Sequence, residues 1–277
     1  MKSKLSERTT RTAATTVENH LPSFKNPPVS EVACGILFSR LENFTTAHGG
    51  AFWTRIRNDF PQTEHAPPIV TPSAMSIDQA LGFPLPRQWF ISKDKQGLLQ
   101  LQGDCLFYNW RRLNDSDVYP RFETVLDCFQ RYLGEFINFL AESGLPSLTI
   151  TGCELTYVNQ IPQEHGWKSQ ADLGKVFRDM YWSPSQHEFL PTPKETGWQM
   201  EFPLPTEGTL TASLISARRV RDNVPTLKLD MSAKVNGEAR PLENVWAWLD
   251  EAHEWIVRGF ADLTQADFQR EAWKRTR

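Results

Sequence analysis

The sequence has no long hydrophobic run. No stretch of the 277 residues approaches the ~20 consecutive apolar residues that a membrane-spanning helix requires, so no membrane association is expected. The first segment, "MKSKLSERTTRTAATTVENH", has no apolar core either, which excludes a secretory signal. Its polar composition predicts a disordered tail over residues 1–21. These features together favour a cytoplasmic protein.

Cysteine is also scarce, and none of it is arranged in a Cys-x-x-Cys pair. Four cysteines occur, widely separated in sequence: Cys34, Cys105, Cys128 and Cys153. This spacing favours small buried thiols in a reducing compartment over disulfides or a zinc site.

Metal and cofactor motifs are missing as well. His253 and Glu254 form half of a zincin motif, but the second histidine would fall at Val257. His253 is therefore interpreted as a histidine at the flank of a helix. No metal and no cofactor are expected.

Catalytic signatures are equally scarce. The sequence has no Gly-x-Ser-x-Gly turn and no glycine-rich phosphate loop, so it offers no catalytic residue. The net charge of −3 gives no broad basic field of the kind that holds a protein to nucleic acid. A non-enzymatic protein is favoured, although an enzyme remains open.

Aromatic residues are abundant, with 10 Trp and 17 Phe, and apolar periodicity predicts a clear order of elements. Residues 29–38 form the first predicted strand, and a short helix ends before Pro61. A proline-rich connection leads to three strands between residues 87 and 113. A long helix follows over residues 120–143.

The same order then begins again. A strand over residues 147–161 is followed by a short helix at 172–182, a proline-rich connection and three strands. A long helix over 242–263 completes the second set. We therefore predict an internally duplicated α+β domain, with repeats at 22–146 and 147–277. The two repeats would form one curved antiparallel sheet with the long helices on one face.

Several motifs occur in an order that resembles a known family. They are "NPPVSEV" (residues 26–32), "LQLQGDCLFYNWRRL", "YPRF" at a helix start, "CELTYVNQI", and "LDEAHEWIVRGF" in the last long helix. The sequence is similar to an uncharacterised, sporadically distributed bacterial family along about residues 22–273. The resemblance implies a cytoplasmic bacterial protein of the same fold. It implies no activity and no catalytic residue.

The strand "CLFYNWRRL" is apolar on both of its alternating faces, which suggests that one face meets something other than the long helix. This pattern favours a scaffold protein that recognises a protein partner, or a second copy of itself, through an exposed aromatic sheet face. Arginines that follow two strands could grip an acidic partner or a phosphate backbone. The candidate residues are Tyr108, Asn109, Trp110, Arg111, Arg112, Arg218, Arg219 and Arg221.

A second candidate cluster lies on the strand "CELTYVNQI" and consists of Glu154, Tyr157 and Asn159. The structural interpretation is a polar group that satisfies itself where the two repeats meet. The functional interpretation is a ligand site shared with Asn109 and Arg111. A small-ligand binder or an enzyme with a pocket between long helix and sheet, and a nucleic-acid binder, remain the alternatives to the scaffold.

Overall fold

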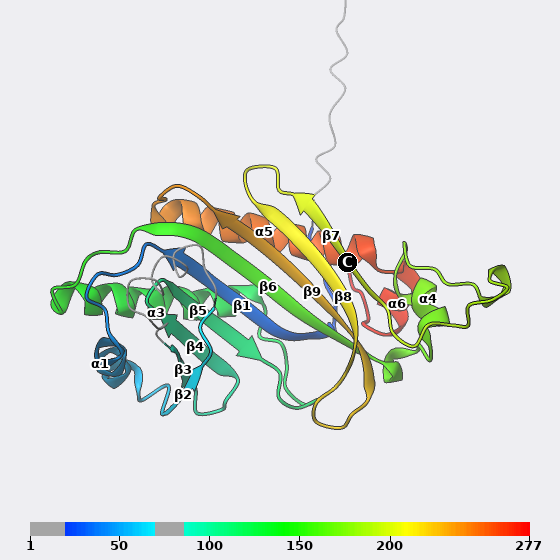
Figure 1. Cartoon of the computed structure of the whole chain (residues 1–277), viewed down its shortest axis with the longest axis horizontal. Coiled ribbons are helices and arrows are strands. Elements are labelled where there is room, and N and C mark those ends of the chain that lie inside the picture. Colours follow the sequence, from blue (N-terminus) through cyan, green and yellow to red (C-terminus); the bar gives the residue numbers. More distant parts are fainter. Residues whose placement is uncertain (1–19, 70–85) are drawn as a thin grey trace, which may run out of the picture.

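A computed structural model describes residues 20–69 and 86–277, and one antiparallel sheet organises them (Figure 1). Its nine described strands lie in the order β2-β3-β4-β5-β1-β6-β9-β8-β7. The sheet is open, with β2 and β7 at its edges. The strands are β1 (Val29–Phe38), β2 (Gln62–Ala66), β3 (Arg87–Ile91), β4 (Gly97–Gln102), β5 (Cys105–Arg111), β6 (Ile150–Pro162), β7 (Gly197–Pro203), β8 (Thr209–Arg218) and β9 (Pro225–Asn236).

Two long helices, α3 (Phe122–Glu142) and α5 (Leu242–Leu263), pack on the same face of the sheet (Figure 1). Shorter helices are α1 (Thr46–Ile56), α4 (Leu173–Val176) and α6 (Ala266–Glu271). Apolar side chains three and four residues apart give each long helix one buried stripe, which includes Phe129 and Phe136 on α3 and Leu249 and Ile256 on α5. The predicted α+β class is therefore confirmed.

The two central strands join two halves of similar topology. β1 pairs with β5 on one side and with β6 on the other. Outward from β1 the order is β5, β4, β3, β2, and outward from β6 it is β9, β8, β7. We call the β1–β6 pairing, with the helix starts above it, the seam. The predicted boundary at 146/147 falls between α3 and β6.

Two elements differ from the sequence prediction. β2 lies where a proline-rich loop was expected, because "QTEHA" is polar, pairs only with β3 and has no apolar alternation. The second short helix is reduced to the single turn α4. The backbone is already extended at Phe177, which forms an isolated bridge with Thr264.

The aromatic strand β5 has both faces inside the protein, which corrects its assignment to an exposed face. Tyr108 and Trp110 point toward the helices, where they meet Tyr132 and Tyr119 at ring-centroid distances of 6.2 and 5.4 Å. Phe107 points the other way. Its ring occupies the space above Gly35 on β1, where any Cβ atom would lie 2.2 Å from a Phe107 ring carbon.

Asn109 is buried on the same side as Phe107 and belongs to a hydrogen-bonded chain across four strands. The Trp89 indole donates to Gln100 (3.0 Å), whose amide donates to Asn109 (2.6 Å), whose amide donates to Glu31. The backbone of Ile69 exchanges two hydrogen bonds with Gln102 on this face. The amide that the sequence offered for partner binding therefore serves a structural network.

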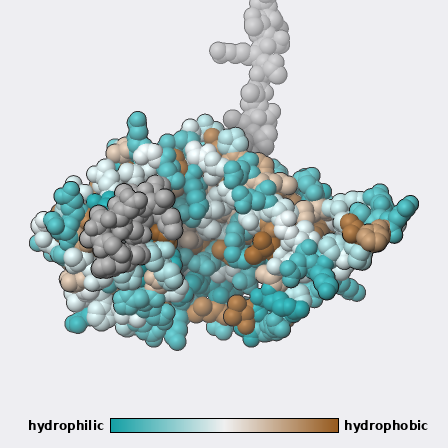
Figure 2. Space-filling model, viewed as in Figure 1, coloured by the Kyte–Doolittle hydropathy of each residue, from teal (hydrophilic) through white to brown (hydrophobic). Residues whose placement is uncertain are grey.

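The corresponding face of the second half is polar and accessible. Lys234 pairs with Glu154 at 3.1 Å, Lys228 pairs with Asp230 at 2.6 Å, and Thr156 bonds Ser232 at 2.6 Å. The molecular surface in the same view is largely hydrophilic, with separate hydrophobic spots (Figure 2). No helix in the described ranges has the length and hydrophobicity needed to cross a membrane.

Candidate functional site

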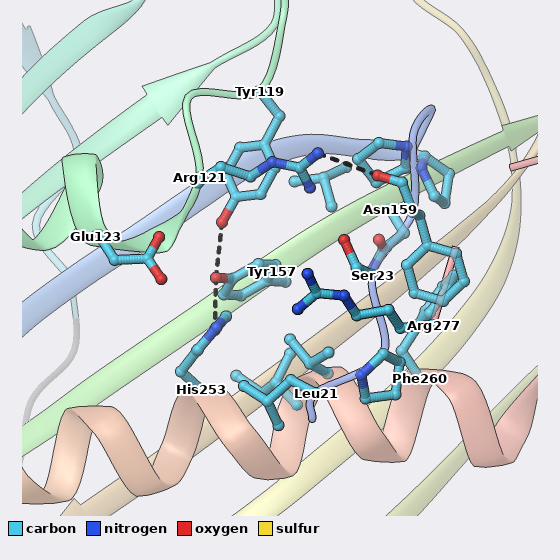
Figure 3. A pocket seen from close by; sticks show the side chains of 17 residues that line it. Leu21, Ser23, Tyr119, Arg121, Glu123, Tyr157, Asn159, His253, Phe260 and Arg277 are labelled. Carbon is cyan, nitrogen blue, oxygen red and sulfur yellow. Dashed lines mark hydrogen bonds between the residues drawn. The ribbon is translucent and has the colours of Figure 1, made fainter. Parts of the chain in front are cut away.

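A pocket of about 400 Å³ opens beside the seam on the helix side of the sheet (Figure 3). We call it the seam pocket. Its walls come from the segment 21–29, the segment leading into α3, strand β6 and helix α5. The apolar wall includes Leu21, Phe24, Ile256, Val257 and Phe260. The polar lining includes Ser23, Tyr119, Arg121, Glu123, Tyr157, Asn159, His253 and Arg277.

Three side chains form a hydrogen-bonded chain at one end of the pocket. The hydroxyls of Tyr119 and Tyr157 are 2.8 Å apart, and the Tyr157 hydroxyl is 2.9 Å from Nδ1 of His253 (Figure 3). The imidazole stacks on Phe122, with ring centroids 4.1 Å apart and planes 8° from parallel. The first half supplies Tyr119, and the second half supplies Tyr157 from β6 and His253 from α5.

All three groups are neutral at pH 7, and burial moves each pKa further from that pH. Desolvation raises the pKa of Tyr119 and of Tyr157 above the ordinary phenol value. Desolvation also lowers the pKa of His253 to about 4, against smaller opposing effects of Glu123 and Glu254. A group that transfers protons works best with a pKa near the working pH. The chain is therefore suited to recognising a polar group by hydrogen bonds.

Arg121 enters the pocket from an unusual backbone position at the start of α3. Its φ of 78° and ψ of 161° lie in a region that only glycine adopts at little cost. The guanidinium donates to the carbonyl of Phe24 at 3.2 Å and lies 5.9 Å from the Tyr119 ring centroid. Arg121 is therefore placed beside the pocket despite local strain.

Two of the three residues in the polar cluster on β6 reach the seam pocket. Tyr157 and Asn159 face the helices and line it. Glu154 faces the other side of the sheet, where it pairs with Lys234. Asn109 also lies on that side, and Arg111 donates to the carbonyl of Lys95. The structure therefore does not bring together the predicted ligand cluster of Glu154, Tyr157 and Asn159 with Asn109 and Arg111.

The two arginine sets do meet at one end of the seam. Arg112, Arg219 and Arg221 line a shared depression of about 260 Å³. The first set, Arg111 and Arg112, stands at the end of β5, and the second set, Arg218, Arg219 and Arg221, stands at the end of β8. Because β5 corresponds to β9 in the sheet order, the two sets do not occupy equivalent positions in the two halves.

The second arginine set is held by groups of the protein itself. Arg219 pairs with Glu164 and Asp222, Arg221 pairs with Asp115, and Arg218 donates to the carbonyl of Asn223. These carboxylates offset much of the basic charge that the sequence suggested.

Sequence reasoning missed Tyr119 and Arg121 and did not connect His253 with Tyr157. The first two lie in a connection without periodicity, and their helix-start motif indicated only where α3 begins. His253 was interpreted as a helix-flank histidine, and it is bonded, as that interpretation requires. Its partner lies 96 residues earlier, a separation that no local pattern reveals.

Comparisons with known proteins give no family and only distant structural similarity. No family model matches the sequence, and a search of curated proteins found no match. The substrate-free duplicated taurocyamine kinase from Schistosoma mansoni aligns with a TM-score of 0.38 and 9% identity, over 84% of this chain and 33% of the kinase. The chain thus spans about a third of the kinase's length. Methanococcus jannaschii TBP aligns with a TM-score of 0.27 and 10% identity, over 83% and 99% of the two chains.

Proposed function

We propose that this protein binds a small, largely apolar organic molecule in the seam pocket. The observation that carries the proposal is the pocket itself, an apolar cavity of about 400 Å³ with neutral polar groups converging at one end. Ligand sites are typically of this size and combine apolar walls with a few placed polar groups. Its position beneath a long helix fits the small-ligand alternative among the expectations from sequence.

The scaffold hypothesis loses its main motivation, because its aromatic residues Tyr108 and Trp110 are in the interior. Recognition of a protein partner or a second copy remains a proposal without an identified surface. Nucleic-acid binding has the shared depression of Arg112, Arg219 and Arg221 as its site, but internal ion pairs weaken its basic field.

The matching strand order on both sides of the seam supports the proposal of an internal duplication. A bacterial origin and a cytoplasmic location rest on the sequence patterns alone. Both remain expectations.

A neutral fluorescent probe, N-phenyl-1-naphthylamine, tests the proposed function. We expect it to bind one site on the protein with enhanced fluorescence, because the pocket has a volume of about 400 Å³ and largely apolar walls. Val257→Phe fills the pocket and is expected to weaken binding at least about tenfold. The matched control is Ala247→Phe on an exposed position of the same helix, which is expected to change nothing.

Two results would contradict the proposal. One is the absence of any saturable binding to the folded wild-type protein. The other is equal binding to the Val257→Phe and Ala247→Phe variants. Circular dichroism of each variant confirms that it is folded before the comparison is made.

A further inference from the structure

The charged groups of the seam pocket are unequal in number. Arg121 and Arg277 carry positive charge, Glu123 carries negative charge, and His253 is neutral at pH 7 because burial lowers its pKa to about 4. The side chains that line the pocket therefore carry one excess positive charge. An apolar pocket with such an excess has a natural complement in an organic molecule with one acidic group.

Arg121 has donors to spare. A guanidinium carries five N–H groups, and the hydrogen bond from Arg121 to the carbonyl of Phe24 uses one of them. No ion pair with a carboxylate holds this side chain within residues 20–69 and 86–277. The residue is exposed at the pocket's edge, so its remaining donors can reach a ligand.

Arg277 approaches the same space from the opposite wall. In Figure 3 its guanidinium points into the pocket toward Tyr157, with Ser23 nearby. In the described part of the chain, its guanidinium has no hydrogen-bond or ion-pair partner. The Glu123 carboxylate lies beyond the Tyr119–Tyr157–His253 chain in the same view, away from the two arginines.

Building on the proposed function, we propose that the ligand of the seam pocket is an organic acid. Its carboxylate, sulfonate or phosphate group lies between Arg121 and Arg277 at the open side. Its apolar body lies deeper, against Phe24, Ile256 and Phe260. Guanidinium groups suit this role because their planar donors match the oxygens of an oxyanion and because they stay charged at any physiological pH.

The backbone of Arg121 supplies an independent argument. A glycine would adopt φ 78° and ψ 161° without strain, yet the position carries a large charged side chain. Strained residues of this kind cluster at ligand clamps and active sites. A charged side chain at a glycine-like backbone position beside a pocket is therefore expected to have a binding role.

The test compares two probes with one skeleton. N-phenyl-1-naphthylamine is neutral, and 8-anilino-1-naphthalenesulfonate adds one sulfonate group. We expect the wild-type protein to bind the sulfonate about tenfold more tightly, since both arginines contact it. Arg121→Gln and Arg277→Gln should each weaken sulfonate binding about fivefold and leave neutral-probe binding within about twofold.

Two further variants complete the design. The matched control is Arg131→Gln, on helix α3 but outside the pocket. It should change neither the affinity for the neutral probe nor the affinity for the sulfonate. Arg121→Gly removes the guanidinium and the strain together. We expect it to fold with an unchanged or higher thermal midpoint while losing the preference for the sulfonate.

The outcomes separate the two proposals. If the neutral probe binds but the sulfonate binds no more tightly, the proposal of an organic-acid ligand is contradicted. The proposal that the pocket binds a small apolar molecule then stands. The same holds if the Arg121 and Arg277 variants weaken both probes equally. If neither probe binds the wild-type protein, the proposed function fails, and the organic-acid ligand fails with it.

Discussion

Strands β4 and β5 in the first half are buried along both faces, whereas β8 and β9 in the second half bury mainly the residues that face the helices. The two sets occupy equivalent places in the sheet order. In the first half, the sheet face away from the helices carries Phe107 and a chain of hydrogen-bonded amides. In the second half, the corresponding face carries ion pairs and hydroxyl groups. Similar topology therefore does not determine whether a sheet face is dry.

The seam, where the two halves meet, should give the largest effect. Burial lowers the pKa of His253 to about 4. Below pH ~6.5 the unfolded chain therefore binds a proton on this histidine, whereas the folded protein does not bind it until the pH is near 4. Stability is therefore expected to fall by about 3 kcal/mol as pH drops from 6.5 to 4. Urea unfolding at several pH values measures this loss. The same titration of His253→Gln should be flatter by that amount, and parallel curves for the two proteins would contradict the interpretation.

Gly35→Val tests the dry face of the first half. The added side chain meets the Phe107 ring, so we expect a loss of about 3 kcal/mol from overpacking. Thr211→Val is the control on the same face of the second half, where a change within about 0.5 kcal/mol is expected. Chemical denaturation measures both free energies.

A double variant, Gly35→Val with Phe107→Ala, sharpens this test. It should lose clearly less stability than the sum of the two single changes, because the substitutions share one space. Strict additivity would show that the ring and the glycine are independent.

Asn109→Ala breaks the amide chain and should cost about 2 kcal/mol, because Gln100 and Glu31 lose a buried partner. Ser232→Ala removes a hydroxyl bonded to Thr156 on the more accessible face of the second half. It should cost about 0.5 kcal/mol. Comparable losses in the two variants, measured by thermal and urea unfolding, would remove the distinction between a dry and a solvated face.

The smallest effect is expected at the contact between Arg221 and Asp115, an exposed ion pair that connects the two halves. Arg221→Gln should change stability by less than about 0.5 kcal/mol, and less still in high salt. Differential scanning calorimetry at low and high salt measures the change. A loss above 1 kcal/mol would show that this ion pair contributes to holding the halves together.

The sequence alone predicted the α+β class, the long helices and most strands, since these depend on local periodicity. Residues 242–263 coincide with α5 because their apolar stripe repeats over six turns. The edge strand β2 was missed because a polar strand without alternation leaves no signal.

The pocket was less predictable than the fold. Tyr157 and Asn159 were identified as a polar group, but their partners Tyr119 and His253 come from two other regions of the chain. The position of Phe107 over Gly35 depends on the pairing register of β1 with β5. A single sequence does not fix this register.

The seam also has a consequence for the order of folding. Strands β3 to β5 and β7 to β9 pair with close neighbours in sequence, whereas the seam joins Ser30 to Val158, 128 residues apart. Closing such a long loop carries a large entropic cost and slows the step that requires it. We expect the two meanders to form early and the central pair to close late. The seam pocket would then form in the last step of folding. A ligand bound there would slow unfolding, because it stabilises the β1–β6 pairing.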